Sequence, residues 1–199
     1  MKILFDLNHP ADVNFFKSAI LKLKNSGVNV RIIFRDRGML EKIIKYELPN
    51  IPIKKIGRHY RGFFKKIFFQ LIRDIYVFRY IHKYKICKVC CFGSNSAIST
   101  WLSGAEYLAF DDDYEYKIPF YHANIFCKYH IYPDFIPFKN KKTIKYSGFK
   151  ELAYLNPKNL KFSNEILEQY FLEPDRYVFV REIQSISLNY KKSNDYLKK

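Results

Sequence analysis

Short apolar runs alternate with amphipathic segments along roughly the first three quarters of the chain. The apolar runs are typical of buried strands, and apolar residues three and four positions apart are typical of helices. This alternation predicts an α/β protein, a Rossmann-like parallel sheet flanked by helices. Strands are predicted at residues 2–7, 29–34, 53–56, 86–92, 106–110 and 130–132, and helices at residues 12–26, 37–46, 94–103 and 116–123.

The pattern changes near residue 148. Residues 1–148 form the predicted N-terminal domain, and residues 149–180 are expected to hold a linker and the start of a second domain. That second part has a predicted short helix at 163–170 and a predicted strand at 177–180. Residues 181–199 are polar and rich in lysine, and we expect them to be poorly ordered. Because a lone strand cannot form a domain, the chain is expected to be truncated on its C-terminal side.

Polar residues directly follow three of the predicted strands, at the edge where open parallel sheets bind ligands. His9 is the candidate catalytic residue, as a general base or as a donor to a sugar, because the ordinary pKa of histidine is near neutrality. The alternative for His9 is a loop residue that fixes the turn beside Pro10. The candidate substrate-binding residues are Asn8, Gly93, Ser94, Asn95, Asp111, Asp112 and Asp113.

The residues that follow the fourth and fifth predicted strands, 93–96 and 111–113, also have simple structural explanations. Residues 93–96 predict a tight turn into a helix, whose first N–H groups can hold an anion or a sugar hydroxyl. Alternatively, Ser94 or Ser96 is an ordinary helix cap. The carboxylates of residues 111–113 suit a cation or sugar hydroxyls, or they lie in solvent at a strand end. The sequence contains no GxGxxG or P-loop fingerprint for a nucleotide.

The segment from Arg58 to Lys85 is basic and rich in aromatic residues. Its apolar residues recur at three- and four-residue spacing, which predicts a helix with one apolar face and a basic border. Such a helix suits an anionic membrane surface, or it is a crossover helix on the sheet with a solvated basic face. Nucleic acid ranks lower, because no known nucleic-acid-binding pattern is present. The residues expected to face a membrane are Arg61, Phe64, Lys65, Lys66, Phe68 and Arg73.

The composition supports a folded chain with an anionic partner. Of the 199 residues, 48% are hydrophobic, and the formal charge is +16. The apolar content excludes a disordered chain, and the charge favours nucleic acid, a membrane or an anionic substrate, although a lysine-rich genome would also raise it. The sequence shows neither a secretory signal nor a membrane-spanning run. We expect a cytoplasmic protein that is peripheral on the inner face of the membrane.

Cys87 and Cys90 have the CxxC spacing of metal and redox sites. They lie in a predicted buried strand, where residues three apart point to opposite faces. No second CxxC and no histidine pair completes a zinc site. Plain buried cysteines, no metal and no cofactor are therefore expected.

Three stretches of the chain together resemble the DUF354 family: LFDLNHPADVNFFK, CFGSNSA with YLAFDDDYE, and YSGFKELAYLNP. That family is related to the glycosyltransferase-B superfamily, which includes MurG-type transferases and UDP-N-acetylglucosamine 2-epimerases. The resemblance implies two Rossmann-like domains around a cleft and nucleotide-sugar chemistry, often in surface polysaccharide synthesis. It implies that His9 and the polar strand ends face the cleft, and that Lys150 and Glu151 lie at the hinge.

The chain departs from the family pattern at several positions. Asp12 and Asn14 stand where the family usually has histidines, and residues 112–116 lack the histidine of the family's DDTEHA-like stretch. The family's C-terminal domain, which in glycosyltransferase-B enzymes holds most nucleotide-sugar contacts, is also not part of the pattern here. The resemblance therefore implies an acceptor-side domain that is inactive alone.

The expected partners of this domain follow from the same resemblance. They are a sugar or lipid-linked acceptor, an anionic membrane surface and a separately encoded C-terminal domain, with a nucleotide sugar as the donor in full-length relatives. The alternatives are half of a UDP-sugar 2-epimerase-like enzyme and a non-enzymatic binder of anionic membrane or polysaccharide.

Overall fold

The computed structural model describes residues 1–58, 62–155 and 165–180. The chain divides into two compact units, Met1–Leu160 and Lys161–Lys199. The first unit holds the sheet and the candidate site. The described part of the second unit contains a short helix, α7 (Glu165–Gln169). The predicted domain boundary near residue 148 stays a prediction, and residues 181–199 lie outside the described residues.

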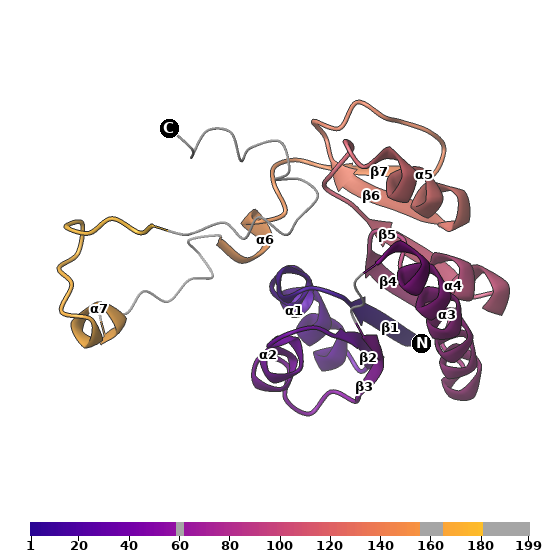
Figure 1. Ribbon diagram of the computed structural model, residues 1–199, viewed down its shortest axis with the longest axis horizontal. Coiled ribbons are helices and arrows are strands. Elements are labelled where there is room, and N and C mark those ends of the chain that lie inside the picture. The colour runs from indigo at the N-terminus through magenta and orange to yellow at the C-terminus, as the bar shows by residue number, and fades with distance from the viewer. Residues whose placement is uncertain (59–61, 156–164, 181–199) are drawn as a thin grey trace. The chain divides into compact units, whose positions relative to one another are not determined.

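Seven strands form one sheet in the order β3-β2-β1-β4-β5-β6-β7 (Figure 1). All six neighbouring pairs are parallel, which confirms the predicted Rossmann-like α/β fold. The strand order reverses between β1 and β4, and open α/β sheets bind ligands beyond the strand ends at such a point. The strands are β1 (Lys2–Leu7), β2 (Asn29–Asp36), β3 (Ile53–Arg58), β4 (Lys88–Phe92), β5 (Glu106–Phe110), β6 (Tyr129–Pro133) and β7 (Thr143–Tyr146).

Helices cover both faces of the sheet, and alternate side chains of each strand serve the two cores. On one face, Ile3, Phe5 and Leu7 of β1 pack with helices α1 and α2. On the other face, Leu4 packs with helices α3, α4 and α5. Asp6 shares the face of Leu4, so this carboxylate points into the second core. The helices of this unit are α1 (Pro10–Asn25), α2 (Leu40–Glu47), α3 (Phe63–Tyr84), α4 (Ala97–Ser103), α5 (Lys117–Phe126) and α6 (Leu152–Leu155).

Two strand predictions were wrong. The edge strand β7 was not predicted, because it has only four residues and no clear apolar run. The strand predicted at 177–180 does not form, and Val178, Phe179 and Val180 are more than 80% exposed. A strand needs a neighbour for its backbone hydrogen bonds, and the described residues of the second unit contain helix and turns but no such neighbour.

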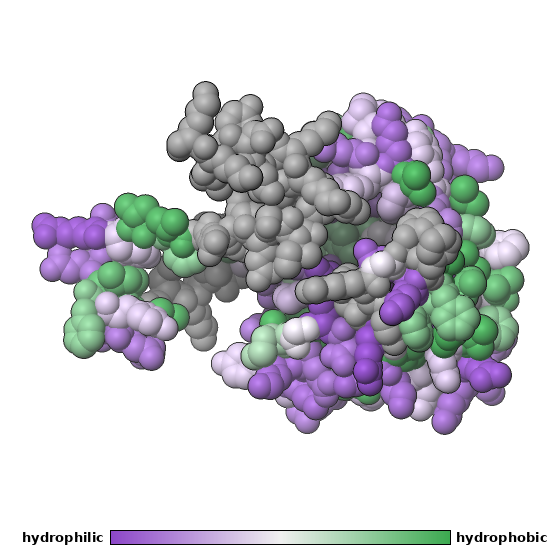
Figure 2. All heavy atoms as spheres, in the orientation of Figure 1, coloured by the Kyte–Doolittle hydropathy of each residue, from purple (hydrophilic) through white to green (hydrophobic). Residues whose placement is uncertain are grey.

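Helix α3 has two different apolar faces. Val77, Tyr80 and Ile81 are buried against the sheet. The spacing predicted one apolar face from residues 64, 67, 68, 71, 75 and 78, but the four from 67 to 75 are exposed instead. Figure 2 shows hydrophobic residues gathered over α3 and α4, at the right of the view. The exposed members on α3 include Ile67, Phe68, Leu71 and Ile75, each 47–60% exposed.

Candidate functional site

The turn between β1 and α1 is held by a capping box. Two backbone N–H groups, of Asn8 and His9, donate to Asp12 Oδ2 at 2.8 and 3.0 Å. In return the His9 ring accepts at Nδ1 from the backbone N–H of Ala11, at 3.1 Å. This reciprocal arrangement satisfies the orphan N–H groups of the helix start, and Pro10 occupies the first helical position, which needs no donor.

The same turn places three polar side chains beside a cavity. Burial raises the pKa of Asp12 to about 6, against the opposing effect of the two backbone donors. A carboxyl group with such a pKa can hold or release a proton near neutral pH. Asn8 is also buried, and its Oδ1 has no hydrogen-bond partner among the described residues. His9 is exposed at the rim of the cavity and fixes the turn, as one of the two sequence alternatives holds. Its predicted catalytic role stays a prediction.

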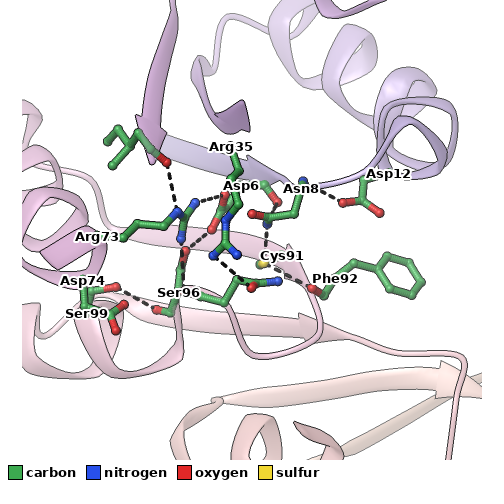
Figure 3. Close-up of polar contacts among 12 residues, drawn as sticks. Asp6, Asn8, Asp12, Arg35, Arg73, Asp74, Cys91, Phe92, Ser96 and Ser99 are labelled. Atoms are coloured by element: carbon green, nitrogen blue, oxygen red, sulfur yellow. Dashed lines mark hydrogen bonds and ion pairs between the residues drawn. The ribbon is translucent and has the colours of Figure 1, made fainter. Parts of the chain in front are cut away.

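A sealed polar cluster lies on the other face of β1 (Figure 3). Asp6 Oδ1 accepts from Arg73 Nη2 at 2.6 Å, and both side chains are at most 1% exposed. Asp6 Oδ2 accepts from the hydroxyl of Ser96. Arg73 also donates from Nε to the Ile56 carbonyl and from Nη1 to the Asn95 carbonyl, each at 3.1 Å. Every charged oxygen of Asp6 is thus paired, as a buried charge requires.

This cluster corrects two predictions. Arg73 does not face a membrane, because it is the buried partner of Asp6, and this carboxylate raises its pKa against the opposing effect of burial. Ser96 occupies the cap position of α4, but its hydroxyl bonds Asp6 rather than the helix backbone. Gly57 lies close to the cluster, with φ +85°, and a Cβ there would come within 3.2 Å of the Arg73 side chain. A side chain at position 57 would therefore be strained and crowded.

The three aspartates after β5 have different environments. Asp111 is buried, and its Oδ1 accepts from the backbone N–H groups of Asp112 and Asp113. Asp112 pairs with Lys150. Burial raises the pKa of Asp112, while the Lys150 ammonium opposes the shift. Asp113 is partly exposed and accepts from the Glu115 N–H at 2.9 Å. As expected from their repulsion, the three carboxylates are not buried together.

Lys150 connects the segment after β7 to the candidate site. Its ammonium pairs with Asp112 and lies 5.3 Å from the centre of the Phe92 ring. Burial would lower the pKa of Lys150, but the neighbouring carboxylates, led by Asp112, raise it overall. The Lys150 side chain is therefore positively charged and is held at the site by Asp112. Its neighbour Glu151 does not line the cavity, and the predicted hinge role of both residues stays a prediction.

These residues surround a cavity of about 400 Å³ at the carboxyl ends of β1, β4 and β5. Asn8, His9, Gly93, Asn95, Asp111 and Asp113 were predicted from the sequence as binding or catalytic residues, and all of them line it. Two predicted binding residues, Ser94 and Asp112, do not. The sequence reasoning missed five polar or aromatic lining residues: Asp12, Arg37, Phe92, Tyr116 and Phe120. Arg37 could have been predicted as a lining residue, since it directly follows β2 at the same edge of the sheet.

His130 is a buried residue that the sequence did not single out. Its side chain is fully buried between Phe120 and Tyr132, and its Nε2 lies 3.8 Å from Asp111 Oδ2. Neither ring nitrogen has a hydrogen-bond partner among the described residues. His130 therefore lies beside Asp111 but does not line the cavity.

The cysteines are not arranged as a metal site. Cys90, Cys91 and Cys127 are buried, and burial raises the pKa of the Cys90 thiol to about 12. Cys87 is exposed, which corrects the prediction of a buried residue, and its thiol donates to the Lys2 carbonyl at 3.0 Å. Within the described ranges, no group of three or more His, Cys, Asp or Glu side chains could hold a metal ion.

The predicted membrane-facing residues fall into three groups. Lys65, Lys66 and Phe68 are exposed on α3, and Arg73 is buried. Arg61 and the Phe64 side chain lie outside what the structure describes. None of the helices in the described ranges is long and apolar enough to cross a membrane.

The sheet, its strand order and the cavity at the β1–β4 switch point define the class: an α/β protein with a Rossmann-like domain. Comparison with solved structures supports this class. MurG of Acinetobacter baumannii matches with a TM-score of 0.59 and 18% identity, over 72% of this chain and 44% of that chain. UDP-GlcNAc 2-epimerase of Methanocaldococcus jannaschii matches with a TM-score of 0.63 and 14% identity, over 86% of this chain and 52% of that chain.

A third match is a glycosyltransferase of Rickettsia africae, with a TM-score of 0.58 and 18% identity, over 87% of this chain and 50% of that chain. This chain thus spans about half the length of these structures, and at these identities the likeness establishes the fold.

The family model of DUF354, described as a protein of unknown function, matches residues 1–92. This match confirms the resemblance found in the sequence. A search of curated proteins found no match.

Proposed function

We propose that this chain is the acceptor-side domain of a glycosyltransferase-B-like protein that acts in the synthesis of a surface polysaccharide or another glycan. The observation that carries the proposal is the cavity at the β1–β4 switch point. Its lining combines amide, carboxyl and imidazole groups, which suit the donor and acceptor pattern of sugar hydroxyls. The names of the structural matches, a MurG, a UDP-GlcNAc 2-epimerase and a glycosyltransferase, support nucleotide-sugar chemistry.

In this proposal the cavity binds the acceptor, and the nucleotide-sugar donor is held by a second domain. Asn8 and Asp113 orient sugar hydroxyls, and Lys150 keeps Asp112 ionised and fixed beside them. His9 or Asp12 accepts the proton of the acceptor hydroxyl as its oxygen bonds to the donor sugar and the nucleotide leaves. A pKa of about 6 suits Asp12 for that task. The domain that holds the donor is the proposed partner, and residues 1–199 without it are expected to be inactive.

The proposal is tested by an NMR titration of the chain with a short oligosaccharide that contains N-acetylglucosamine. We expect shifts in the amides of Asn8, His9 and Asp113, and no turnover of UDP-N-acetylglucosamine. Asp113→Asn keeps the shape of the residue and should weaken binding about fivefold to tenfold, because a neutral amide is a poorer acceptor for hydroxyls than a carboxylate.

Asp36→Asn is the matched control, because Asp36 ends β2 at the same edge of the sheet but lies outside the cavity. Equal weakening by the two variants, or shifts confined to other regions, would contradict the sugar site. Turnover by the chain alone would contradict its role as an acceptor-side domain. A product epimerised at C2 would instead support the 2-epimerase-like alternative.

A second candidate function is binding to an anionic membrane, with or without an enzymatic role. The exposed apolar stripe of α3 supports it, together with Trp101 and Leu102 of α4, which are each 58% exposed. Exposed Lys65 and Lys66 border the stripe on the same helix. An apolar surface with a basic border is typical of interfacial membrane binding.

Sedimentation with vesicles of phosphatidylcholine and phosphatidylglycerol tests this function. We expect binding that weakens as the salt concentration rises, because the attraction between the charges is screened. Phe68→Ser should weaken binding several-fold, since the aromatic side chain contributes apolar area. Tyr46→Ser is the control, because Tyr46 is 83% exposed but lies on α2. Failure to bind anionic vesicles at low salt would contradict this function.

A further inference from the structure

A second cavity, of about 540 Å³, lies between α3, α4 and the carboxyl ends of β2 and β3. It shares Asn95 with the candidate sugar site but opens on the other side of the loop after β4. Its lining includes the cationic side chains of Arg35, Arg58 and Lys66. Arg73 also lines it, but Asp6 already neutralises that charge. Among the described lining residues, Asp74 is the one carboxylate, so cations are in excess.

Arg35 is the residue that makes this cavity unusual. Its Nη2 donates to Gln70 Oε1 at 2.7 Å and to Asn95 Oδ1 at 3.3 Å, and both acceptors are neutral amides. Its Nε is buried without a hydrogen-bond partner among the described residues. Burial and the neighbouring Arg73 lower the pKa of Arg35. A partly buried guanidinium that lacks a carboxylate partner is unfavourable, and an anionic ligand would relieve that cost.

The backbone explains why Arg35 points here. The register between β2 and β3 shifts between Phe34 and Asp36, so Arg35 lies at an irregularity of the ladder. Such irregularities redirect a side chain and are frequent beside binding sites. In Figure 3, Arg35 and Arg73 reach toward the end of β1 from β2 and α3, respectively. Arg58 lies at the end of the neighbouring strand, and Lys66 lies one turn into α3.

We propose that this cavity binds a phosphate or diphosphate group. Guanidinium groups suit phosphate because they donate paired N–H bonds and stay charged, and lysine adds a further point charge at the rim. Ile67, Leu71 and Ile98 supply an apolar wall, and the first two belong to the exposed stripe of α3. The bound anion therefore belongs to a lipid headgroup or to a free phosphorylated compound. The proposal does not depend on the sugar site.

Calorimetric titration of the chain with inorganic pyrophosphate at low salt tests the site. Arg35→Gln should weaken binding about tenfold or more, because a charge-assisted hydrogen bond is lost. Arg58→Gln should weaken it several-fold. Lys42→Gln is the matched control, since it removes one exposed charge on α2, away from the cavity. Arg58 is exposed, so Arg58→Gln is expected to fold. Its binding therefore tests the proposal even if Arg35→Gln unfolds the chain.

A second arm distinguishes the sources of the anion. Vesicles of phosphatidylcholine with phosphatidic acid are compared with uridine diphosphate in solution, using the same variants. Vesicle binding that falls in Arg58→Gln but not in Lys42→Gln indicates a lipid phosphate, and the same pattern with uridine diphosphate indicates a free one. Equal effects of Arg58→Gln and Lys42→Gln, or no binding of any probe, would overturn the proposal. Neither result depends on whether the other cavity binds a sugar.

Discussion

Two pairs of a cation and an aspartate lie at the carboxyl edge of one sheet, and their surroundings differ. The Arg73–Asp6 pair is sealed, with side chains 1% and 0% exposed, whereas the Lys150–Asp112 pair is 24% and 28% exposed and borders the candidate sugar site. The side chains of Arg73 and Asp6 make three further hydrogen bonds, to the Ile56 and Asn95 carbonyls and to the Ser96 hydroxyl. The sealed pair joins α3 to β1, while the open pair stays available to a ligand.

This difference shows why charge alone does not identify a functional residue. Arg73 belongs to a strongly basic segment, yet it is a structural residue. Lys150 also follows a lysine-rich stretch, residues 139–145, yet it reaches the candidate site. Burial decides the role, because a sealed charge costs stability when it loses its partner and an open charge can be solvated.

The largest expected effect is on the sealed pair. Arg73→Met should lower the free energy of unfolding by about 3–5 kcal/mol, because Asp6 would remain buried without its partner. Urea denaturation measures this change. Arg79→Met is the control, since Arg79 is exposed on the same helix, and it should change stability by less than about 0.5 kcal/mol. Similar effects of the two variants would mean that the pair does not hold α3 in place.

An intermediate effect is expected for Asp12, the buried carboxyl of the open side. Its pKa rises from 3.8 to about 6, so between these values the native state keeps a proton that the unfolded state has released. The free energy of unfolding of the wild type therefore falls as the pH rises from 3.8 to about 6. The fall is complete above the pKa of Asp12 in the native state. Asp12→Asn lacks this loss, so its stability relative to the wild type should rise by about 2 kcal/mol between pH 4 and pH 7.

Urea titrations of both proteins across this pH range measure the difference. Asp36→Asn is the control, because it removes a partly exposed carboxylate at the end of β2, outside the cavity. A stability difference between Asp12→Asn and the wild type that stays constant with pH would show that folding does not raise the pKa of Asp12.

The smallest effect is expected for the open pair. Lys150→Met should lower the free energy of unfolding by less than about 1 kcal/mol, because solvent replaces much of the lost interaction. A double-mutant cycle with Asp112→Asn measures the coupling, which should shrink as salt is added. A coupling as large as that between Arg73 and Asp6 would remove the distinction between the two pairs.

Much of the fold could be predicted from local patterns. The strands that end at Leu7, Phe92 and Phe110 were found because buried parallel strands are continuous apolar runs. The residues that follow these strands were therefore predicted to lie at one edge of the sheet, and six of them meet in the cavity. The strand β7 was missed, because its four residues at the sheet edge carry little pattern. The strand predicted at 177–180 failed, because apolar character alone cannot supply a neighbouring strand.

The sequence by itself determined the alternation of strands and helices, the parallel sheet and the edge at which its polar residues lie. These features depend on periodicity and on neighbours along the chain. Only the tertiary structure decided that Asp6 and Arg73, 67 residues apart, neutralise each other. It also decided that α3 turns an apolar stripe outward, and that the hydrogen-bond partners of Arg35 among the described residues are neutral amides. The physical reason is that burial and charge pairing depend on which distant residues meet, and local periodicity does not record those contacts.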